Sequence, residues 1–214
     1  MINLISPPPR FLIKRYKNWK SNSFQKNLSN FKKLSSRGQK PSAMVISCCD
    51  SRVHPTSIFR AEEGEFFIHR NIANFVPPYS SRKENYGILS TLEYAIKELK
   101  VKHLIILGHT DCGGIKAAYK LHLNSLNKKY NFINKWLELF IMSYDNIDKK
   151  NPKKKQLEQL EKETIKTSIK NLFSYNFIKT AVRIKKLSIH GLIHNIGTGQ
   201  LQFLNPATKD FEKL

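Results

Sequence analysis

The sequence contains few cysteines and no long apolar stretch. The first feature argues against a disulfide-stabilised protein, and the second against a membrane-spanning one. Its three cysteines are Cys48, Cys49 and Cys112. An odd, small number in a chain without a recognisable secretion signal argues against a framework of disulfides. Metal binding or catalysis is then a better explanation for the presence of these three cysteines. No stretch approaches the ~20 apolar residues that span a bilayer, so we expect a cytoplasmic protein with no membrane insertion.

Acidic residues are also scarce, and none occurs before Asp50. The 37 lysines and arginines outnumber the 16 aspartates and glutamates, which gives a formal net charge of +21. Such an excess raises the possibility of nucleic-acid binding. The sequence lacks, however, zinc-finger spacing, an RNA-binding aromatic motif and a heptad-linked basic region. We therefore expect a solvated basic surface that helps to attract a small anion, and no specific nucleic-acid partner.

The composition is that of a globular protein with one sizeable core. Of the 214 residues, 40% are hydrophobic and 25% are charged, which is a normal balance for such a protein. Residues 10–36 are polar with apolar positions at near-helical spacing, and residues 35–38 interrupt the pattern. We predict two parts, an N-terminal helical arm at 1–36 and an α/β catalytic domain at 37–214.

Short apolar runs alternate with helical patterns along the rest of the chain. The runs have the length and the branched residues of buried strands, and the segments between them have helical periodicity. The predicted strands are 43–47, 66–68, 103–108, 187–193 and 200–204, and the predicted helices are 89–99, 115–126, 132–147 and 156–186. This alternation predicts an α/β fold with a mostly parallel central sheet of four to five strands, flanked by helices.

Potential metal ligands follow two of these strands directly. Cys48 ends the first apolar run and His109 ends the third, so both are expected at the carboxyl edge of one sheet. Cys112 stands three residues after His109, and thiolate and imidazole are both good zinc ligands. A third ligand must come from elsewhere, and the only other cysteines are Cys48 and Cys49.

Alternation of side chains in an extended chain favours Cys48 as that third ligand. Alternate residues share a face, so Cys48 points with Asp50 and Arg52, while Cys49 points the other way. We expect Cys49 to be a small buried hydrophobe. Three protein ligands leave a fourth position open, which is the arrangement of catalytic zinc. Asp50 is the rival fourth ligand, and it would make the site closed and structural.

The motifs around these ligands resemble those of the β-class carbonic anhydrases. The family pattern Cys-x-Asp-Ser-Arg-Val is present from Cys48 to Val53, and His-x-x-Cys-Gly-Gly is present from His109 to Gly114. Further family-like stretches are found at 38–41, 64–67, 70–74, 76–79, 90–95 and 190–191. The two zinc motifs, about 60 residues apart with these blocks in order, are far more specific together than either is alone.

The resemblance implies reversible hydration of carbon dioxide to bicarbonate and a proton, with one zinc ion per subunit. Zinc-bound hydroxide attacks the carbon in this family. Asp50 corresponds to the residue that accepts a hydrogen bond from the hydroxide, and Arg52 to the residue that holds this carboxylate off the metal. An arginine fork suits that second role because it matches a carboxylate with two bonds and keeps it ionised.

The same resemblance assigns a substrate pocket and an assembly. Gln39 corresponds to a polar residue that helps to bind bicarbonate, and Gly113 to a backbone contact with substrate. Phe67, Ile72 and Tyr94 correspond to an apolar wall around carbon dioxide, as suits a weakly polar gas. The family's pocket lies at a subunit interface, so a homodimer or tetramer is expected, with the arm packed on a partner subunit.

Two other functions are compatible with the same residues. One is a related zinc hydrolase that acts on carbon disulfide or carbonyl sulfide. The other is a basic, non-enzymatic zinc protein, which predicts a closed site and salt-sensitive binding of nucleic acid. Arg52 argues against the closed site because it is placed to restrain Asp50.

Overall fold

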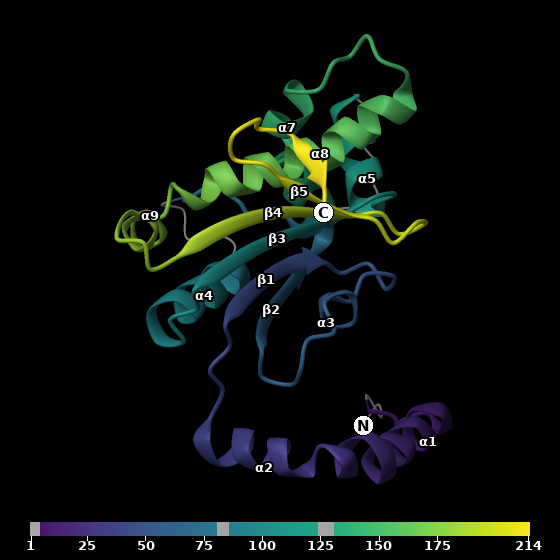
Figure 1. Ribbon diagram of the computed structural model, residues 1–214. Helices are drawn as coiled ribbons and strands as arrows, with labels where there is room; N and C mark the ends of the chain where they lie inside the picture. The colour runs from purple at the N-terminus through teal and green to yellow at the C-terminus, as the bar shows by residue number, and fades with distance from the viewer. Residues whose placement is uncertain (1–4, 81–85, 124–130) are drawn as a thin grey trace. The chain divides into compact units, whose positions relative to one another are not determined.

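The computed structural model describes residues 5–80, 86–123 and 131–214. The chain divides into two compact units, Met1–Gln39 and Lys40–Leu214, and each unit is considered by itself (Figure 1). The boundary between the units follows Gln39, three residues after residue 36, where the sequence pattern predicts that the arm ends.

The first unit is the predicted helical arm. Its elements are α1 (Arg10–Trp19), the π-helical turn η1 (Lys20–Phe24) and α2 (Leu28–Arg37). Helix α1 begins directly after a run of three prolines, which cannot continue a helix interior. Gly38 ends α2 with a φ of 72°, in the left-handed region that favours glycine. None of these helices has a buried residue. The aromatic and aliphatic side chains of the arm therefore stay partly or fully exposed to solvent within this chain.

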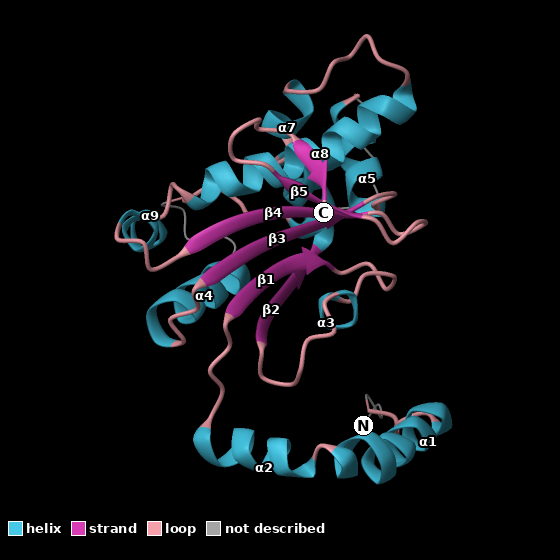
Figure 2. Ribbon diagram, viewed as in Figure 1, coloured by secondary structure: helices cyan, strands magenta, loops and turns pink. Residues whose placement is uncertain are grey.

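The second unit is built on one six-stranded sheet in the order β2-β1-β3-β4-β5-β6 (Figure 2). The strands are β1 (Ala43–Cys48), β2 (Phe66–Asn71), β3 (His103–His109), β4 (Ser188–His194), β5 (Leu201–Leu204) and β6 (Phe211–Lys213). The first four are parallel, and β5 and β6 are antiparallel to their neighbours. The α/β fold and the mostly parallel sheet are thus confirmed. The strand count is one above the predicted range because β6 is only three residues long and has no apolar run to mark it.

The helices follow the predicted segments but break more often. They are α3 (Pro55–Ile58), η2 (Ile72–Asn74), α4 (Tyr86–Glu93), η3 (Tyr94–Glu98), α5 (Gly113–His122), α6 (Phe132–Glu138), α7 (Ile141–Asp145), α8 (Lys153–Leu172) and α9 (Asn176–Arg183). Segment 132–147 forms two helices rather than one, and so does segment 156–186. The end of the predicted helix 115–126 lies outside the described residues. No helix in the described part of the chain has both the length and the apolar character needed to cross a membrane.

Both faces of β1 are buried, which explains its uninterrupted apolar sequence. Met44 and Ile46 face the main core, which α4, α8 and α9 cover. Val45 faces the opposite side and packs with Val53 and Leu107 in a smaller cluster beside α3. A strand buried on both faces holds its last residue, Cys48, in a fixed place.

Two glycines let α8 approach the sheet closely. A Cβ on Gly108 would lie 2.6 Å from the Ile165 side chain of α8, and one on Gly191 would lie 3.0 Å from the same residue. The close approach brings the middle of α8 alongside the end of β3, where the predicted ligands are.

Candidate metal centre

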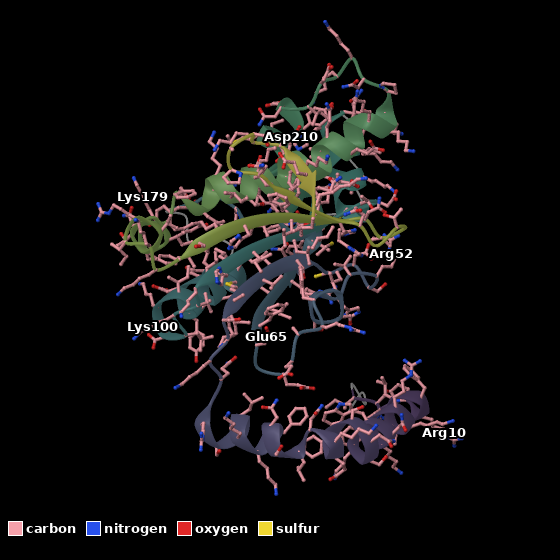
Figure 3. All side chains as sticks on the ribbon, in the orientation of Figure 1. Arg10, Arg52, Glu65, Lys100, Lys179 and Asp210 are labelled. Carbon is pink, nitrogen blue, oxygen red and sulfur yellow. The ribbon has the colours of Figure 1, made fainter. Side chains whose placement is uncertain are left out.

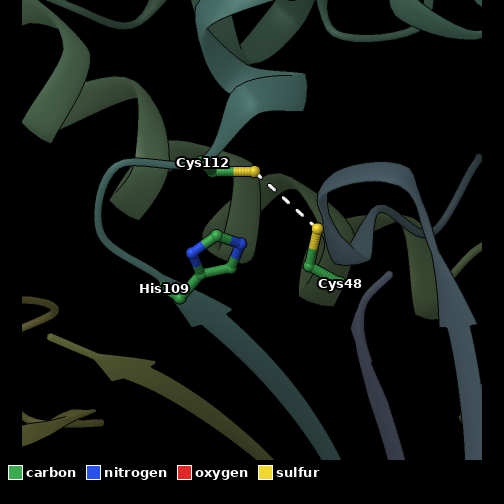
Figure 4. A group of neighbouring side chains, drawn as sticks. All are labelled: Cys48, His109 and Cys112. Carbon is green, nitrogen blue, oxygen red and sulfur yellow. Dashed lines mark hydrogen bonds between the residues drawn. The ribbon is translucent and has the colours of Figure 1, made fainter. Parts of the chain in front are cut away.

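Three side chains converge where β1 and β3 end. Cys48 is the last residue of β1, His109 is the last residue of β3, and Cys112 is the N-cap of α5. Their ligand atoms all lie within 4.8 Å of one another, and the two Sγ atoms are 3.9 Å apart (Figure 4). Two sulfurs bound to one tetrahedral zinc at about 2.3 Å each lie about 3.8 Å apart. The site therefore already has the spacing that zinc requires.

The orientation of His109 also fits a metal ligand. Its Nδ1 lies 2.9 Å from the Thr110 carbonyl oxygen, to which an N–H at that position donates. Its Nε2 is buried and has no hydrogen-bond partner among the described residues. In Figure 4 one ring nitrogen faces the space between the two sulfurs. A donating Nδ1 leaves the Nε2 lone pair available, which is the usual arrangement of a zinc-binding histidine.

The two cysteines provide a thiolate at neutral pH. The hydrogen bond from Cys112 lowers the pKa of Cys48 and raises that of Cys112, because one thiol stabilises the other as an anion. The backbone N–H of Ala73 also donates to Cys48 Sγ, at 3.4 Å. Thiolate is the form of cysteine that binds metals, so the chemistry of the donor set agrees with its geometry.

Asp50 lies beside this cluster and is held by Arg52. Arg52 Nε lies 2.9 Å from Asp50 Oδ1, and Arg52 Nη2 lies 2.8 Å from Oδ2. The Arg52 backbone N–H also donates to Oδ1, at 3.0 Å. These bonds hold the pKa of Asp50 well below its usual range. Asp50 Oδ2 is 3.9 Å from His109 Nε2, so the carboxylate faces the cluster without being one of its three members.

Comparison with known proteins agrees with this site. The family model for carbonic anhydrase matches residues 43–201, which include all three clustered residues. The chain belongs to the β-carbonic anhydrase family. Beta carbonic anhydrase 3 of Arabidopsis thaliana is 36% identical to it over 85% of this chain and 70% of that protein. As a member of this family the chain is an enzyme, a carbonic anhydrase.

Solved structures of the family share its fold. The β-carbonic anhydrase CcaA is 32% identical, with a TM-score of 0.89 over 96% of this chain and 98% of that one. One of two tetrameric β-carbonic anhydrases from Sordaria macrospora is 28% identical, with a TM-score of 0.77 over 91% of this chain and 95% of that one.

Arg70 supports the site in a way that sequence reasoning missed. It stands in β2, and its Nε donates to the Cys48 carbonyl at 2.9 Å. Its Nη2 donates to the carbonyls of Asp50 and Val53, each at 2.8 Å. One guanidinium thus fixes the backbone on both sides of Asp50. The block 70–74 belongs to the family resemblance, but nothing in its spacing indicates this bracing.

We expect Arg70→Lys to weaken the carbonic anhydrase site without unfolding the protein. Lysine keeps the charge but cannot donate to three carbonyls in a fixed fork. Losing such support of a metal site typically lowers metal affinity or activity by about 10-fold to 100-fold. Zinc titration and the rate of carbon dioxide hydration measure both effects. Arg60→Lys, at an exposed arginine, is the matched control, and equal behaviour of the two variants would contradict the bracing.

Glu161 is a second residue that the sequence did not reveal. It is only 6% exposed, and its Oε1 accepts a hydrogen bond from the Cys112 backbone N–H at 3.3 Å. Burial raises its pKa to about 7. In the sequence it belongs to a lysine-rich helix that resembles a solvated surface, and only the close packing of α8 on β3 brings it to the site.

Left-handed backbone gathers around the cluster at residues other than glycine. Ala73, Asn74 and Asp111 have φ values of 61°, 49° and 59°. Ala73 donates to Cys48, and Asp111 lies between His109 and Cys112. Such conformations persist only where the surroundings impose them, and they are common at functional sites.

Cys49 differs from our expectation. It is exposed rather than buried. It comes directly after the last residue of β1, and its backbone N–H donates to the Asn71 carbonyl. The alternation that points Cys48 inward turns Cys49 outward, to the surface.

The predicted pocket residues are only partly brought to the cluster. Ile72 is the first residue of η2, its carbonyl accepts a hydrogen bond from Trp136 Nε1 at 3.0 Å, and a Cβ on Gly114 would lie 2.7 Å from its side chain. Gly113 opens α5 immediately after Cys112, and within the described residues nothing lies within 4 Å of where its Cβ would be. Ile72 and Gly113 therefore flank the cluster of Cys48, His109 and Cys112.

Phe67 and Tyr94 form a pair elsewhere in the chain, with ring centroids 5.9 Å apart. Phe67 lies opposite Met44 in the sheet, whereas Asn71 lies opposite Cys48. Four strand residues, about 13 Å, therefore separate Phe67 from the level of Cys48. Gln39 ends the N-terminal unit, and its role stays a prediction.

Proposed function

We propose that this carbonic anhydrase holds one zinc ion on Cys48, His109 and Cys112 and catalyses the reversible hydration of carbon dioxide to bicarbonate and a proton. The convergence of these three side chains carries the proposal. Zinc, when bound, would supply a Lewis acid that lowers the pKa of water toward about 7. Two thiolates reduce the charge of the ion, so the best activity is expected above neutral pH.

Asp50 and Arg52 have the complementary task of orienting the attacking water. Arg52 occupies both carboxylate oxygens of Asp50 and draws the group away from the ligand position. The ionised carboxylate still accepts a hydrogen bond on its side facing His109. With zinc held by Cys48, His109 and Cys112, Asp50 would orient the attacking water without serving as a ligand itself, as a catalytic zinc site requires.

Substrate is proposed to lie between Ile72 and the start of α5. An apolar side chain suits carbon dioxide, and the backbone at Gly113, at a helix N-terminus, suits the negative oxygens of bicarbonate. Gln39, Phe67 and Tyr94 are proposed to complete this pocket. Since Phe67 and Tyr94 lie away from the cluster of their own chain, a partner subunit would have to supply them.

A homodimer or tetramer is proposed on the same grounds. The arm exposes a row of large apolar side chains, namely Phe11, Leu12, Ile13, Tyr16 and Trp19. Such a surface marks a protein contact, and the Sordaria macrospora relatives are tetrameric. The cytoplasmic location stays a prediction.

Stopped-flow carbon dioxide hydration with parallel metal analysis tests the proposed function. We expect about one zinc per chain and hydration with a kcat/KM in the enzymatic range of about 10⁴–10⁸ M⁻¹s⁻¹. A zinc-loaded protein that hydrolyses carbonyl sulfide or carbon disulfide but does not hydrate carbon dioxide would contradict the substrate. A protein that stays free of zinc would contradict the site.

A further inference from the structure

A groove lies at the end of the sheet opposite the metal centre. It is formed where η3 and α9 end, beside the amino ends of β3 and β4, and its volume is about 1,010 Å³. All its lining residues belong to the Lys40–Leu214 unit. Six residue steps along β3, about 20 Å, separate His103 at the groove from His109 at the metal site. In Figure 3, Lys100 and Arg52 mark these two ends.

The rim of the groove is basic. Its lining includes five lysines, Lys97, Lys100, Lys102, Lys185 and Lys186, and neither aspartate nor glutamate. Lys97 pairs with Glu93 and lies 5.4 Å from the centroid of the Phe177 ring. The other four lysines form no ion pair with any described residue. The groove therefore presents positive charge that no described carboxylate neutralises.

The floor of the groove is apolar. Ile96, Phe177 and Ala181 are partly exposed there, and Ile184, which follows α9, is 51% exposed. Helix α9 turns Ile178 into the core. Phe177 and Ala181 pack against the edge of that core, and their remaining exposed surface lines the groove. An apolar floor with a charged rim is typical of a site that binds an amphipathic segment.

Helix stability explains only part of this charge. Lys100 and Lys185 have φ values of 53° and 57° and follow the ends of η3 and α9. A cation there stabilises the negative end of the helix dipole. Lys102 and Lys186, however, belong to the segments leading into β3 and β4. The Lys186 backbone N–H does cap α9 by donating to the Ala181 carbonyl, but that bond does not require a charged side chain.

We propose that this groove docks an acidic amphipathic segment of a partner protein. Charge complementarity requires an anionic occupant, and the apolar floor requires one that also carries hydrophobic side chains. A concave floor favours a protruding peptide segment over a flat membrane surface. The Phe177 ring lies among aliphatic side chains in this floor and under Lys97, which is a poor platform for a run of stacked nucleic-acid bases. Because the groove and the metal ligands lie at opposite ends of the strands, an occupied groove leaves the active site open. The groove thus anchors the enzyme to a partner.

Fluorescence anisotropy with a labelled model peptide tests this proposal. The probe is a helical peptide of Leu-Leu-Glu-Glu repeats, titrated with the zinc-loaded full chain. We expect saturable binding that Lys185→Glu with Lys186→Glu weakens at least about tenfold. Ile184→Ser is expected to weaken it too, because it removes part of the floor. Neither change touches the active site, so carbon dioxide hydration is expected to stay unchanged.

The matched control is Lys150→Glu with Lys153→Glu, which alters the net charge equally but lies outside the groove. If both double variants weakened binding equally, binding would depend only on the net positive charge of the protein and not on the groove. That result would overturn the proposal. Indifference to Ile184→Ser would do the same. Binding of phosphatidylserine vesicles through Lys185 and Lys186, without binding of the peptide, would assign the surface to a membrane instead.

Discussion

Cys48→Ser is expected to abolish zinc binding and carbon dioxide hydration together. Serine has nearly the volume of cysteine, so a site that is 5% exposed keeps its packing. The hydroxyl, however, does not ionise near neutral pH and is not among the ligands that zinc selects. Zinc is then left with His109 and Cys112, which cannot hold it. We expect zinc content and hydration rate each to fall by about 100-fold or more.

Cys49→Ser is the matched control, since it makes the same substitution one residue along the chain. Its thiol is exposed and lies outside the cluster. The variant should therefore bind about one zinc and hydrate carbon dioxide at the rate of the unmodified protein. Metal analysis measures the zinc content, and a stopped-flow assay measures the rate of carbon dioxide hydration. Circular dichroism checks that each variant is folded. Retention of zinc by Cys48→Ser, or its loss from Cys49→Ser, would contradict the ligand assignment.

The ligand positions could be predicted because strand ends are visible in the sequence. Two apolar runs, 43–47 and 103–108, are too uniform for half-exposed strands, and parallel strands buried on both faces end at one edge. Cys48 and His109 therefore had to lie near each other. The structure places their ligand atoms within 4.8 Å of each other, as predicted. Their role as zinc ligands and the roles given to Asp50, Arg52 and the pocket residues stay proposals.

The support of the site could not be predicted because it depends on distant packing. Glu161 reaches Cys112 only because Gly108 lets α8 lie close to β3. The bracing by Arg70 depends on the register that sets Asn71 beside Cys48. Helix breaks within 132–147 and 156–186 were missed for a related reason, since a continuous apolar periodicity does not mark where a chain turns. Local pattern indicates which strands are buried, whereas tertiary contact decides which side chains meet and, for Glu161 and Cys49, which side chains are buried.

Asp50→Asn is expected to keep zinc but lose most of the activity. The substitution leaves the three ligands in place, so metal content should stay near one per chain. Asparagine has one acceptor oxygen where aspartate has two, so the Arg52 fork can no longer grip it at both positions. The uncharged group is also a weaker acceptor for the water that it orients. Losing a contact that orients the attacking group typically costs about 100-fold in rate.

The pH dependence of this loss of activity distinguishes two causes. Asp50 can act by orienting the attacking water, or its own titration can change the rate. Arg52 holds the pKa of Asp50 well below its usual range, so the carboxylate stays ionised at neutral and alkaline pH. The ratio of the two rates should therefore be constant at alkaline pH values where the attacking water is ionised in both proteins, because only one protonation state of Asp50 is compared. Asp111→Asn is the matched control: Asp111 is 70% exposed and pairs with Lys116, and asparagine tolerates its left-handed backbone. A fully active Asp50→Asn, or a ratio that still varies with pH where the attacking water is ionised in both proteins, would contradict the orienting role of Asp50, since the carboxylate acts in one ionised form throughout.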